Sequence, residues 1–333
     1  MKKLRIALLS KWHVHAQQYA NEFRSYPDCE VAAVWDTDAA RGAAWAEELG
    51  CGFEPELKRL LARGDIDAVC VATETAMHGE VLTAAADAGK HIFTEKVLAA
   101  TMADAEKIKA AVQRAGVKFC ISFPHRCMRE HLYVKKLVES GALGDVTLLR
   151  IRNAHDGAVS GWLPGSFYVE EDCGGGAMMD LGAHPMYLAA WYMGEPRRVT
   201  SMFTHVTGKA VEDNAVSLIE FGNGSIAVSE TGFVSKNSPM SLEIAGTKGS
   251  VFAFGPDRNV KVNAEGMDGW RVVPTDEMPP ALPAPTLMFA RGVINDEPIP
   301  FGLDDAVMLS RLMQGAYESH KTGRTTELGA FKK

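Results

Sequence analysis

The sequence lacks the long apolar runs and the excess positive charge that characterise membrane proteins and nucleic-acid-binding proteins. No stretch approaches the ~20 apolar residues of a membrane span, and the apolar residues 4–9 are too few for the core of a signal peptide. The formal net charge of −7 does not provide the excess positive charge that binding to nucleic acid or an anionic membrane requires. We therefore expect neither a nucleic-acid partner nor a membrane partner.

Cysteine pairs with redox or metal-ligand spacing are also missing. The cysteines are scattered, and no two of them form a Cys-x-x-Cys motif. In a chain of this size they indicate reduced thiols, so we expect a cytoplasmic location. Their spacing gives no metal site, and the sequence predicts none. The six positions are Cys29, Cys51, Cys70, Cys120, Cys127 and Cys173.

Internal repeats and low-complexity tracts are absent, and the 333 residues suffice for two domains. The composition, 47% hydrophobic and 23% charged, is that of an ordinary globular protein. Over residues 1–122, short apolar runs alternate with helical patterns. This alternation predicts an α/β fold, a Rossmann-type doubly wound parallel sheet that forms a dinucleotide-binding domain. The expected strands are 4–9, 30–35, 68–72, 91–94 and 117–122.

The pattern changes after about residue 123. A predicted helix near 129–140 and a strand at 145–154 precede runs with partial alternation, and Asn223-Gly224 is a hairpin turn signal. Residues 123–333 are therefore predicted to form a substrate-binding and oligomerisation domain of the α+β type with a large, mainly antiparallel open sheet. Its alternating runs are 198–207, 213–221, 225–233, 240–246, 249–254 and 259–263; prolines at 279–285 mark a loop and 304–320 a final helix.

Two short motifs carry the candidate chemistry. Three glycines, at 174 to 176, precede Asp180 and His184, which are four residues apart in what the pattern predicts as the first turns of a helix. That spacing places a carboxylate and an imidazole on one helix face. Together with a lysine from elsewhere in the fold, such as Lys96, this set can move a proton on and off a hydroxyl oxygen near neutral pH.

These motifs resemble those of the Gfo/Idh/MocA family of nicotinamide-dependent oxidoreductases. The family pattern in the second domain is a glycine triplet followed by Asp, Gly and His, and its Glu-Lys-Pro signature is similar to Glu95-Lys96-Val97. The resemblance implies an NAD cofactor, catalysis by Lys96, Asp180 and His184, and a homodimer or homotetramer paired through the second-domain sheet. It covers nearly the whole chain, including Asp36, residues 73–78 and residues 141–144.

The loop after the first predicted strand departs from the dinucleotide-binding pattern. Residues 10–15 read Ser-Lys-Trp-His-Val-His where Gly-x-Gly-x-x-Gly is expected, so all three glycines are missing. The next helix N-terminus still offers N–H groups to phosphate, and His13 and His15 could add donors. The histidines could instead face solvent, or bind a metal for which no third ligand is apparent. The predicted cofactor contacts from this loop are Ser10, Trp12, His13 and Val14.

Further cofactor contacts are predicted at the ends of later strands. Asp36 would accept hydrogen bonds from the adenosine ribose and repel a 2′-phosphate, which favours NAD over NADP; alternatively it caps the next helix. By the resemblance, residues 73–78 lie under the nicotinamide ribose, and Lys96 hydrogen-bonds both ribose and substrate. Val97 replaces the family proline, whose peptide bond is often cis. The predicted contacts here are Asp36, Thr73, Glu74, His78, Glu95 and Lys96.

A second group of residues is predicted to contact substrate. Arg126 resembles a family position near the pocket, and Trp162 and Tyr168 could pack against a sugar ring. Arginines and aromatic residues are also favoured at interdomain interfaces, so that alternative stays open. The predicted substrate set is Lys96, Arg126, His155, Trp162, Tyr168, Asp180 and His184.

The function expected from these residues is NAD-dependent oxidoreduction. A hydride would pass between nicotinamide and a secondary alcohol of a sugar, cyclitol or sugar derivative, while Lys96 and His184 share the hydroxyl proton. Two alternatives remain. Retained NAD could oxidise a glycoside transiently and allow elimination or epimerisation, or the chain could be a catalytically silent sugar- or nucleotide-binding protein.

Overall fold

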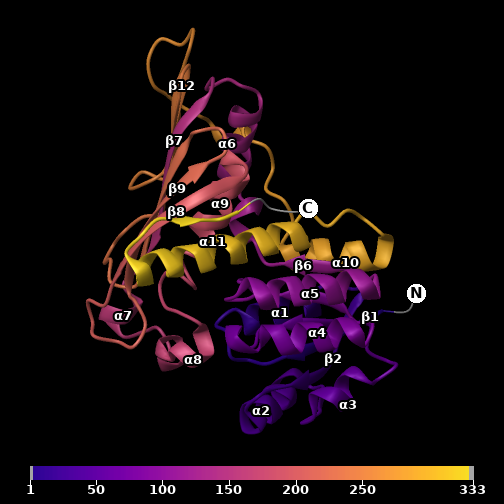
Figure 1. Ribbon diagram of the computed structural model, residues 1–333. Coiled ribbons are helices and arrows are strands. Elements are labelled where there is room, and N and C mark those ends of the chain that lie inside the picture. Colours follow the sequence, from indigo (N-terminus) through magenta and orange to yellow (C-terminus); the bar gives the residue numbers. More distant parts are fainter. Residues whose placement is uncertain (1–2, 330–333) are drawn as a thin grey trace. The chain divides into compact units, whose positions relative to one another are not determined.

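The computed structural model describes residues 3–329, which form two compact units (Figure 1). The first unit comprises the chain up to Phe123 together with Pro283–Val307, and the second comprises Pro124–Leu282 and the chain from Met308 onward. The segment 283–307, which sequence reasoning assigned to the second domain, therefore packs with the first unit. Within residues 3–329, no helix is both long enough and apolar enough to cross a bilayer.

The first unit is built on six parallel strands in the order β3-β2-β1-β4-β5-β6. This is the doubly wound order in which ligands bind beyond the carboxyl ends of the strands, and it confirms the predicted Rossmann-type sheet. β4 is buried at every position, as expected for a strand covered on both faces. The strands are β1 (Leu4–Leu9), β2 (Cys29–Trp35), β3 (Gly52–Phe53), β4 (Ala68–Val71), β5 (His91–Thr94) and β6 (Phe119–Ile121).

Helices connect these strands, and local capping fixes several of their ends. The side chain of Asp38 accepts hydrogen bonds from two N–H groups in the first turn of α2, and the Thr101 hydroxyl caps α5 by accepting from the Asp104 N–H. Gly50 and Gly116 end these two helices with φ of 69° and 65°. The helices are α1 (Ala16–Ser25), α2 (Ala39–Leu49), α3 (Leu57–Leu61), α4 (His78–Asp87) and α5 (Met102–Ala115).

One helix of the first unit lies where the sequence predicted a loop. The prolines at 279–285 indicated a loop, but Pro285 begins α10 (Pro285–Asn295), where its fixed φ suits the first helical turn. Phe289 of this helix is fully buried, with its ring 5.9 Å from that of Phe93 on β5 and 6.4 Å from that of Phe23 on α1. This aromatic packing explains why the segment belongs to the first unit.

The second unit is built on a nine-stranded sheet in the order β14-β13-β12-β11-β7-β10-β9-β8-β15. Neighbouring strands are antiparallel except β7 and β10, so the sheet is mixed but mainly antiparallel, as expected. Gly224, with φ of 85°, turns the chain between β9 and β10. The strands are β7 (Val146–Ala154), β8 (Pro196–Thr204), β9 (Asn214–Phe221), β10 (Ile226–Gly232), β11 (Ser241–Gly246), β12 (Gly249–Phe254), β13 (Asn259–Ala264), β14 (Arg271–Val272) and β15 (Thr326–Glu327).

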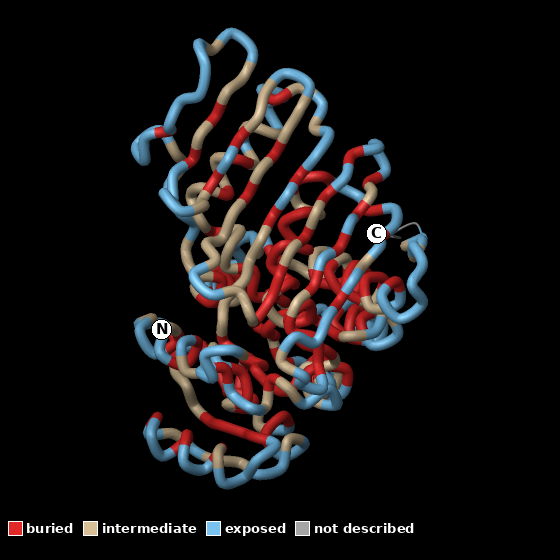
Figure 2. The backbone as a smooth tube through the Cα atoms, turned by 90° about the vertical axis from the view of Figure 1, so that its left-hand side faces the viewer, coloured by how far each residue is buried: buried red, intermediate tan, exposed pale blue. Residues whose placement is uncertain are grey.

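The two faces of this sheet have different surroundings. On one face α9 packs against β7 and β10, and α6 packs against β12. Buried and exposed positions alternate along strands of the protein (Figure 2). Along β9 every second side chain is buried on that side, whereas Val216 and Leu218 between them are 39% and 48% exposed. The open face thus carries apolar side chains in contact with solvent. The helices of this unit are α6 (Arg129–Glu139), α7 (Gly157–Ser160), α8 (Glu170–Cys173) and α9 (Ala183–Met193), and α11 spans Leu303–Thr322.

Candidate active site

The polar residues predicted at the strand ends of the first unit are indeed buried there. Ser10 follows β1, Asp36 follows β2, Thr73 lies beyond β4 and Glu95 follows β5, and each is at most 3% exposed. In a parallel sheet these positions share one edge, where a doubly wound domain binds its nucleotide. Buried polar groups at this edge need partners, and their hydrogen bonds define the site.

Ser10 takes over the conformational role of the missing first glycine. Its φ is 73°, in the left-handed region that glycine adopts without strain. Its hydroxyl donates to Asp36 at 3.1 Å and accepts from the Trp12 N–H, also at 3.1 Å. Trp12 itself is only 8% exposed, so its indole is packed into the protein. The glycine-free loop is therefore held in its turn by a side chain.

Asp36 is the anchor of this loop. It accepts hydrogen bonds from the backbone N–H groups of Lys11 and Asp38 at 2.8 and 3.0 Å and from Arg41 Nε at 3.0 Å. Burial by itself raises the pKa of Asp36, but the bonds from Arg41 and the backbone outweigh burial and lower that pKa. The alternative helix-cap role is wrong, because Asp38 caps α2. Arg41, which sequence reasoning missed, places a cation beside this carboxylate.

Thr73 and Glu74 offer polar atoms suited to a nucleotide. The hydroxyl of Thr73 and Oε2 of Glu74 are buried without a hydrogen-bond partner within the described residues, although Glu74 Oε1 accepts from Thr37 at 2.9 Å. Unpaired buried polar atoms are costly, so this pair fits an absent ligand that donates and accepts hydrogen bonds, as ribose hydroxyls do. The strand-end edge thus has donor and acceptor groups for a dinucleotide.

His78 supports the turn that carries Lys96. Its Nδ1 lies 2.8 Å from the carbonyl oxygen of Val97, and burial lowers its pKa, so the neutral ring donates from Nδ1 to that carbonyl. The Lys96–Val97 peptide bond is cis, the form that the family proline often takes. Lys96 is 4% exposed. His78, predicted as a cofactor contact, has this turn as its hydrogen-bonding partner.

Glu95 is the centre of a side-chain cluster. Its Oε1 accepts a hydrogen bond from the Tyr19 hydroxyl and lies 2.7 Å from His15 Nδ1 and 3.4 Å from His13 Nδ1. Burial opposes ionisation of Glu95, but the nearby His13 and His15 lower its pKa well below the usual range. The two histidines, for which phosphate contact, solvent exposure and metal binding were all considered, thus lie against a carboxylate. Neither Glu95 as their partner nor Tyr19 was foreseen.

The glycine run of the second unit is fixed by Glu212. Its carboxylate accepts from the N–H groups of Gly176 and Met178, each at 2.9 Å, and from the Tyr317 hydroxyl at 2.6 Å. A Cβ at Gly176 would overlap the carbonyl oxygen of Glu212, and one at Gly175 would overlap the Tyr317 hydroxyl. The glycines are therefore required by close approach. Neither Glu212 nor Tyr317 was predicted from the sequence.

Asp180 lies in a turn, and the prediction that it begins a helix is wrong. α9 starts only at Ala183. The turn is closed by the Asp180 N–H donating to Gly176 O at 2.9 Å and by the Gly182 N–H donating to Ala177 O at 2.8 Å. The glycines upstream supply these close backbone contacts, so the chain turns before it can continue as a helix. Asp180 and His184 thus follow one another across a turn–helix junction.

His184 is oriented by an aromatic cluster. Its Nδ1 lies 3.0 Å from the Tyr187 hydroxyl, and its ring stacks on that of His125 at 4.3 Å with an interplanar angle of 12°. The backbone N–H of His125 donates to the same Tyr187 hydroxyl at 3.3 Å. His184 is 5% exposed, so its position is defined by these contacts. Tyr187 stands where the family often has an aspartate. That difference in the sequence is the feature that could have pointed to Tyr187 as the contact of His184.

The remaining predicted substrate residues are His155 with Trp162, Arg126, and Tyr168. His155 stacks on Phe233 at 5.0 Å and packs against Trp162 at 4.6 Å, while burial lowers its pKa and the nearby Asp180 opposes that shift. Arg126, in contrast, lies over the ring of Trp191 at 5.0 Å. Tyr168 keeps a buried hydroxyl without a hydrogen-bond partner in the described part of the chain.

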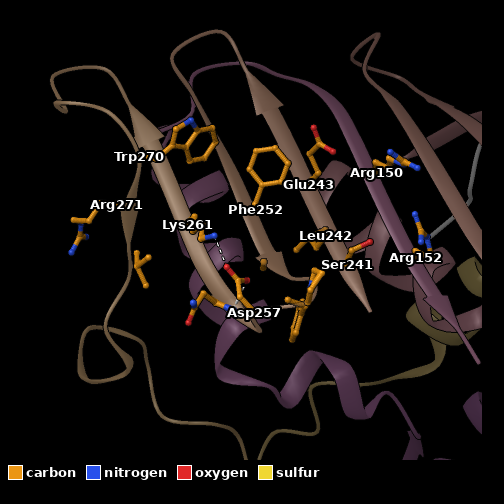
Figure 3. A pocket seen from close by; sticks show the side chains of 16 residues that line it. Arg150, Arg152, Ser241, Leu242, Glu243, Phe252, Asp257, Lys261, Trp270 and Arg271 are labelled. Atoms are coloured by element: carbon orange, nitrogen blue, oxygen red, sulfur yellow. Dashed lines mark hydrogen bonds and ion pairs between the residues drawn. The ribbon is translucent and has the colours of Figure 1, made fainter. Parts of the chain in front are cut away.

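A hollow of about 800 Å³ lies elsewhere, on the open face of the nine-stranded sheet (Figure 3). A row of side chains on neighbouring strands lines it. Arg150 on β7 lies opposite Glu243 on β11, which lies opposite Phe252 on β12. Phe252 in turn lies opposite Lys261 on β13. Trp270 packs on Phe252 at 5.0 Å. None of the predicted catalytic residues lines this hollow, so it is a feature of the sheet surface.

The doubly wound sheet and its strand-end polar groups define a nucleotide-binding protein, and comparison with known proteins places it more closely. Residues 12–123 match the oxidoreductase family domain with an NAD-binding Rossmann fold, and residues 131–252 match the GFO/IDH/MocA C-terminal domain. The chain belongs to the Gfo/Idh/MocA family of NAD-dependent oxidoreductases, as its motifs indicated. The first unit is accordingly an NAD-binding domain.

Relatives and solved structures agree with this assignment. The chain is 30% identical over 226 residues to 1,5-anhydro-D-fructose reductase of Ensifer adhaerens, which covers 67% of each chain. It is 27% identical over 275 residues to D-glucoside 3-dehydrogenase of Escherichia coli K12, covering 75% of this chain and 77% of the relative. A levoglucosan dehydrogenase solved with NADH and levoglucosan has the same fold, with a TM-score of 0.87, 21% identity and coverage of 99% and 100%.

Proposed function

We propose that this protein is an NAD-dependent dehydrogenase or reductase for a secondary alcohol of a sugar, cyclitol or sugar derivative. The observation that carries the proposal is the presence of two buried side chains in a chain of this family. Lys96 lies just beyond β5, in the turn whose Val97 carbonyl contacts His78, and His184 lies at the start of α9 against Tyr187. The relatives named above for sugar substrates support the substrate class.

The chain's own residues have distinct roles in this reaction. Bound NAD would accept or donate the hydride. Lys96 and His184 would share the proton of the substrate hydroxyl, which requires both side chains to face the same oxygen. Asp180, whose charge acts on His155, would accept a hydrogen bond from a neighbouring substrate hydroxyl. Thr73 and Glu74 would bind ribose through their unpaired buried atoms.

The decisive experiment is a panel of sugars, glycosides and inositols with NAD and NADP, followed by the absorbance of reduced nicotinamide. Net reduction of NAD by one class supports the proposal. Product formation without net reduction would establish the retained-NAD alternative, in which oxidation is later reversed. Nucleotide or sugar binding without turnover by any member of the panel would point to a silent binding protein.

Variants at the proposed proton-transfer groups complete this test. Lys96→Ala and His184→Ala should fold and bind NAD but lose about 10²–10⁴-fold in turnover, the usual contribution of a general acid–base group. Asp180→Asn should mainly raise KM. The exposed His205→Ala is the matched control, with circular dichroism to verify folding. Near-normal kcat in His184→Ala would move the role to Lys96 alone, or to His125 or His155.

We also propose that the open face of the nine-stranded sheet pairs with a second copy of the chain. Met202, Leu218 and Ile226 on this face are 73%, 48% and 45% exposed. Beside them Glu230 accepts from Arg150 at 2.8 Å and Arg152 at 2.9 Å, which holds a charged row in place. A large apolar surface with an ordered polar portion is typical of an interface.

A further inference from the structure

Three side chains with metal-ligating atoms converge in the first unit. One atom each of His13, His15 and Glu95 lies within 4.8 Å of the other two. We propose that these residues form a binding site for a divalent transition-metal ion of the Zn²⁺ type. This proposal is independent of the reaction proposed above, because it concerns ion binding and uses neither substrate nor turnover.

The spacing of the ligand atoms suits such an ion. Metal–ligand bonds of about 2.0–2.2 Å in tetrahedral geometry place neighbouring ligand atoms about 3.4 Å apart. His13 Nδ1 is already 3.4 Å from Glu95 Oε1, and on binding it would exchange the hydrogen bond that it accepts from the His15 N–H at 3.2 Å for the ion. His15 Nδ1 is 2.7 Å from the same oxygen, so this pair must open by roughly 0.7 Å when an ion replaces the proton that it shares. His15 can make that movement, because its side chain is 38% exposed.

The ligand types select the class of ion. Imidazole nitrogens favour zinc and the late transition metals, whereas Mg²⁺ and Ca²⁺ prefer sites made of oxygen atoms. Two histidines and one glutamate form a three-residue set that leaves a fourth position for water or an oxygen atom of a bound ligand. His13 and Glu95 are buried, and the partly exposed His15 gives the ion a route from solvent.

Neighbouring groups hold the carboxylate in a ligating orientation. Oε2 of Glu95 accepts from the backbone N–H of Lys96 at 2.8 Å, and Oε1 accepts from the Tyr19 hydroxyl, whose second partner is Ser122 Oγ at 2.9 Å. Such outer partners orient ligands and commonly affect affinity by 10–100-fold. Tyr19 is therefore a positioning residue of this site.

The origin of the site lies in the loop that lacks the glycine fingerprint. His13 and His15 occupy positions on that loop, and Glu95 reaches them from the end of β5, 80 residues along the chain from His15. Because parallel strands end at one edge of the sheet, the fold supplies the third ligand that the sequence did not reveal.

The test uses the whole 333-residue chain, stripped of metal with a chelator and dialysed. Titration calorimetry with ZnCl₂ should give one site per chain, and Co²⁺ should produce the visible absorption of a tetrahedral N/O-ligated ion. Glu95→Gln and His15→Ala should each weaken Zn²⁺ binding more than tenfold, and Tyr19→Phe by about tenfold. His205→Ala, at an exposed histidine outside the cluster, should bind as the parent does.

His15→Ala keeps the test decisive even if Glu95→Gln fails to fold, because His15 is partly exposed and its removal leaves the buried core intact. Unchanged Zn²⁺ affinity in folded His15→Ala would overturn the proposal, as would the absence of saturable binding to the parent. Equal loss in His205→Ala would also overturn it, since the ion would then bind surface histidines.

Discussion

The hydroxyl of Tyr187 lies 3.0 Å from Nδ1 of His184, one turn earlier on α9. The same hydroxyl oxygen accepts the backbone N–H of His125, so this one oxygen contacts both of the stacked histidines. A tyrosine thus performs the orienting task that an acidic residue performs in many catalytic histidines.

Tyr187→Phe should remove this orientation and keep the ring packing. A neutral hydrogen bond contributes about 0.5–1.5 kcal/mol, so kcat should fall by up to about tenfold. The pH profile of kcat should shift as well. A merely structural change would leave that profile in place, so the shift distinguishes the two roles. Tyr133→Phe, at a tyrosine outside the cluster, is the control, and an unchanged profile in Tyr187→Phe would rule out the role.

Glu212→Ala should destabilise the second unit and impair catalysis together. The substitution leaves the buried N–H groups of Gly176 and Met178 without their acceptor, at a cost of about 1–3 kcal/mol each. Because Asp180 follows this segment directly, kcat/KM should fall even where the variant is folded. Thermal unfolding and steady-state kinetics measure the two effects. Tyr317→Phe removes only one of the three partners and should be milder in both.

Cofactor choice should depend on the balance between Asp36 and Arg41. The low pKa of Asp36 keeps it ionised at neutral pH, which favours NAD over NADP by repelling a 2′-phosphate. Arg41, 30% exposed at its side chain, counteracts this repulsion. Arg41→Ala should therefore widen the preference for NAD, and Asp36→Asn should narrow it. Calorimetric titration of both cofactors checks this, and tighter NADP binding by the parent would contradict the prediction.

Stability should decrease below about pH 6.5, in part through His131. Burial, and then the neighbouring His125, lower the pKa of His131 well below its usual 6.5 in the folded protein. The unfolded state therefore binds more protons below pH 6.5, and stability is lost as pH falls toward the folded pKa, at about 1.4 kcal/mol per pH unit. His131→Gln should reduce this slope in thermal unfolding between pH 7.5 and 5.5, measured with buffers of matched ionic strength. An equal slope would refute the assignment.

Pairing through the open sheet face should be sensitive to charge at its centre. Leu218→Arg places a cation on the apolar row and should convert a dimer or tetramer into smaller species at micromolar concentration, as light scattering would show. Lys321→Arg on α11 is a conservative control. A parent protein that is monomeric under the same conditions would refute the pairing proposal.

Much of the architecture is determined by local sequence patterns. Buried apolar runs alternating with helical periodicity predicted the parallel sheet, because such strands must be covered on both faces. The same pattern placed Asp36 and Glu95 correctly at strand ends. It failed at Asp180: Glu212, 36 residues along the chain from Gly176, binds the glycine run there, a turn follows, and the helix begins only at Ala183. It failed also at Pro285, which begins a helix rather than a loop.

Only the tertiary structure decided which groups the functional side chains contact. Periodicity specifies which face a side chain occupies, but the partner of a buried polar group depends on which distant segment the fold brings beside it. Glu95 meets His15 because β1 and β5 end at one edge of the sheet, and the residues between them carry no signal of that contact. The sequence by itself thus determined the fold class and the catalytic candidates, whereas burial and long-range packing decided how each candidate is held.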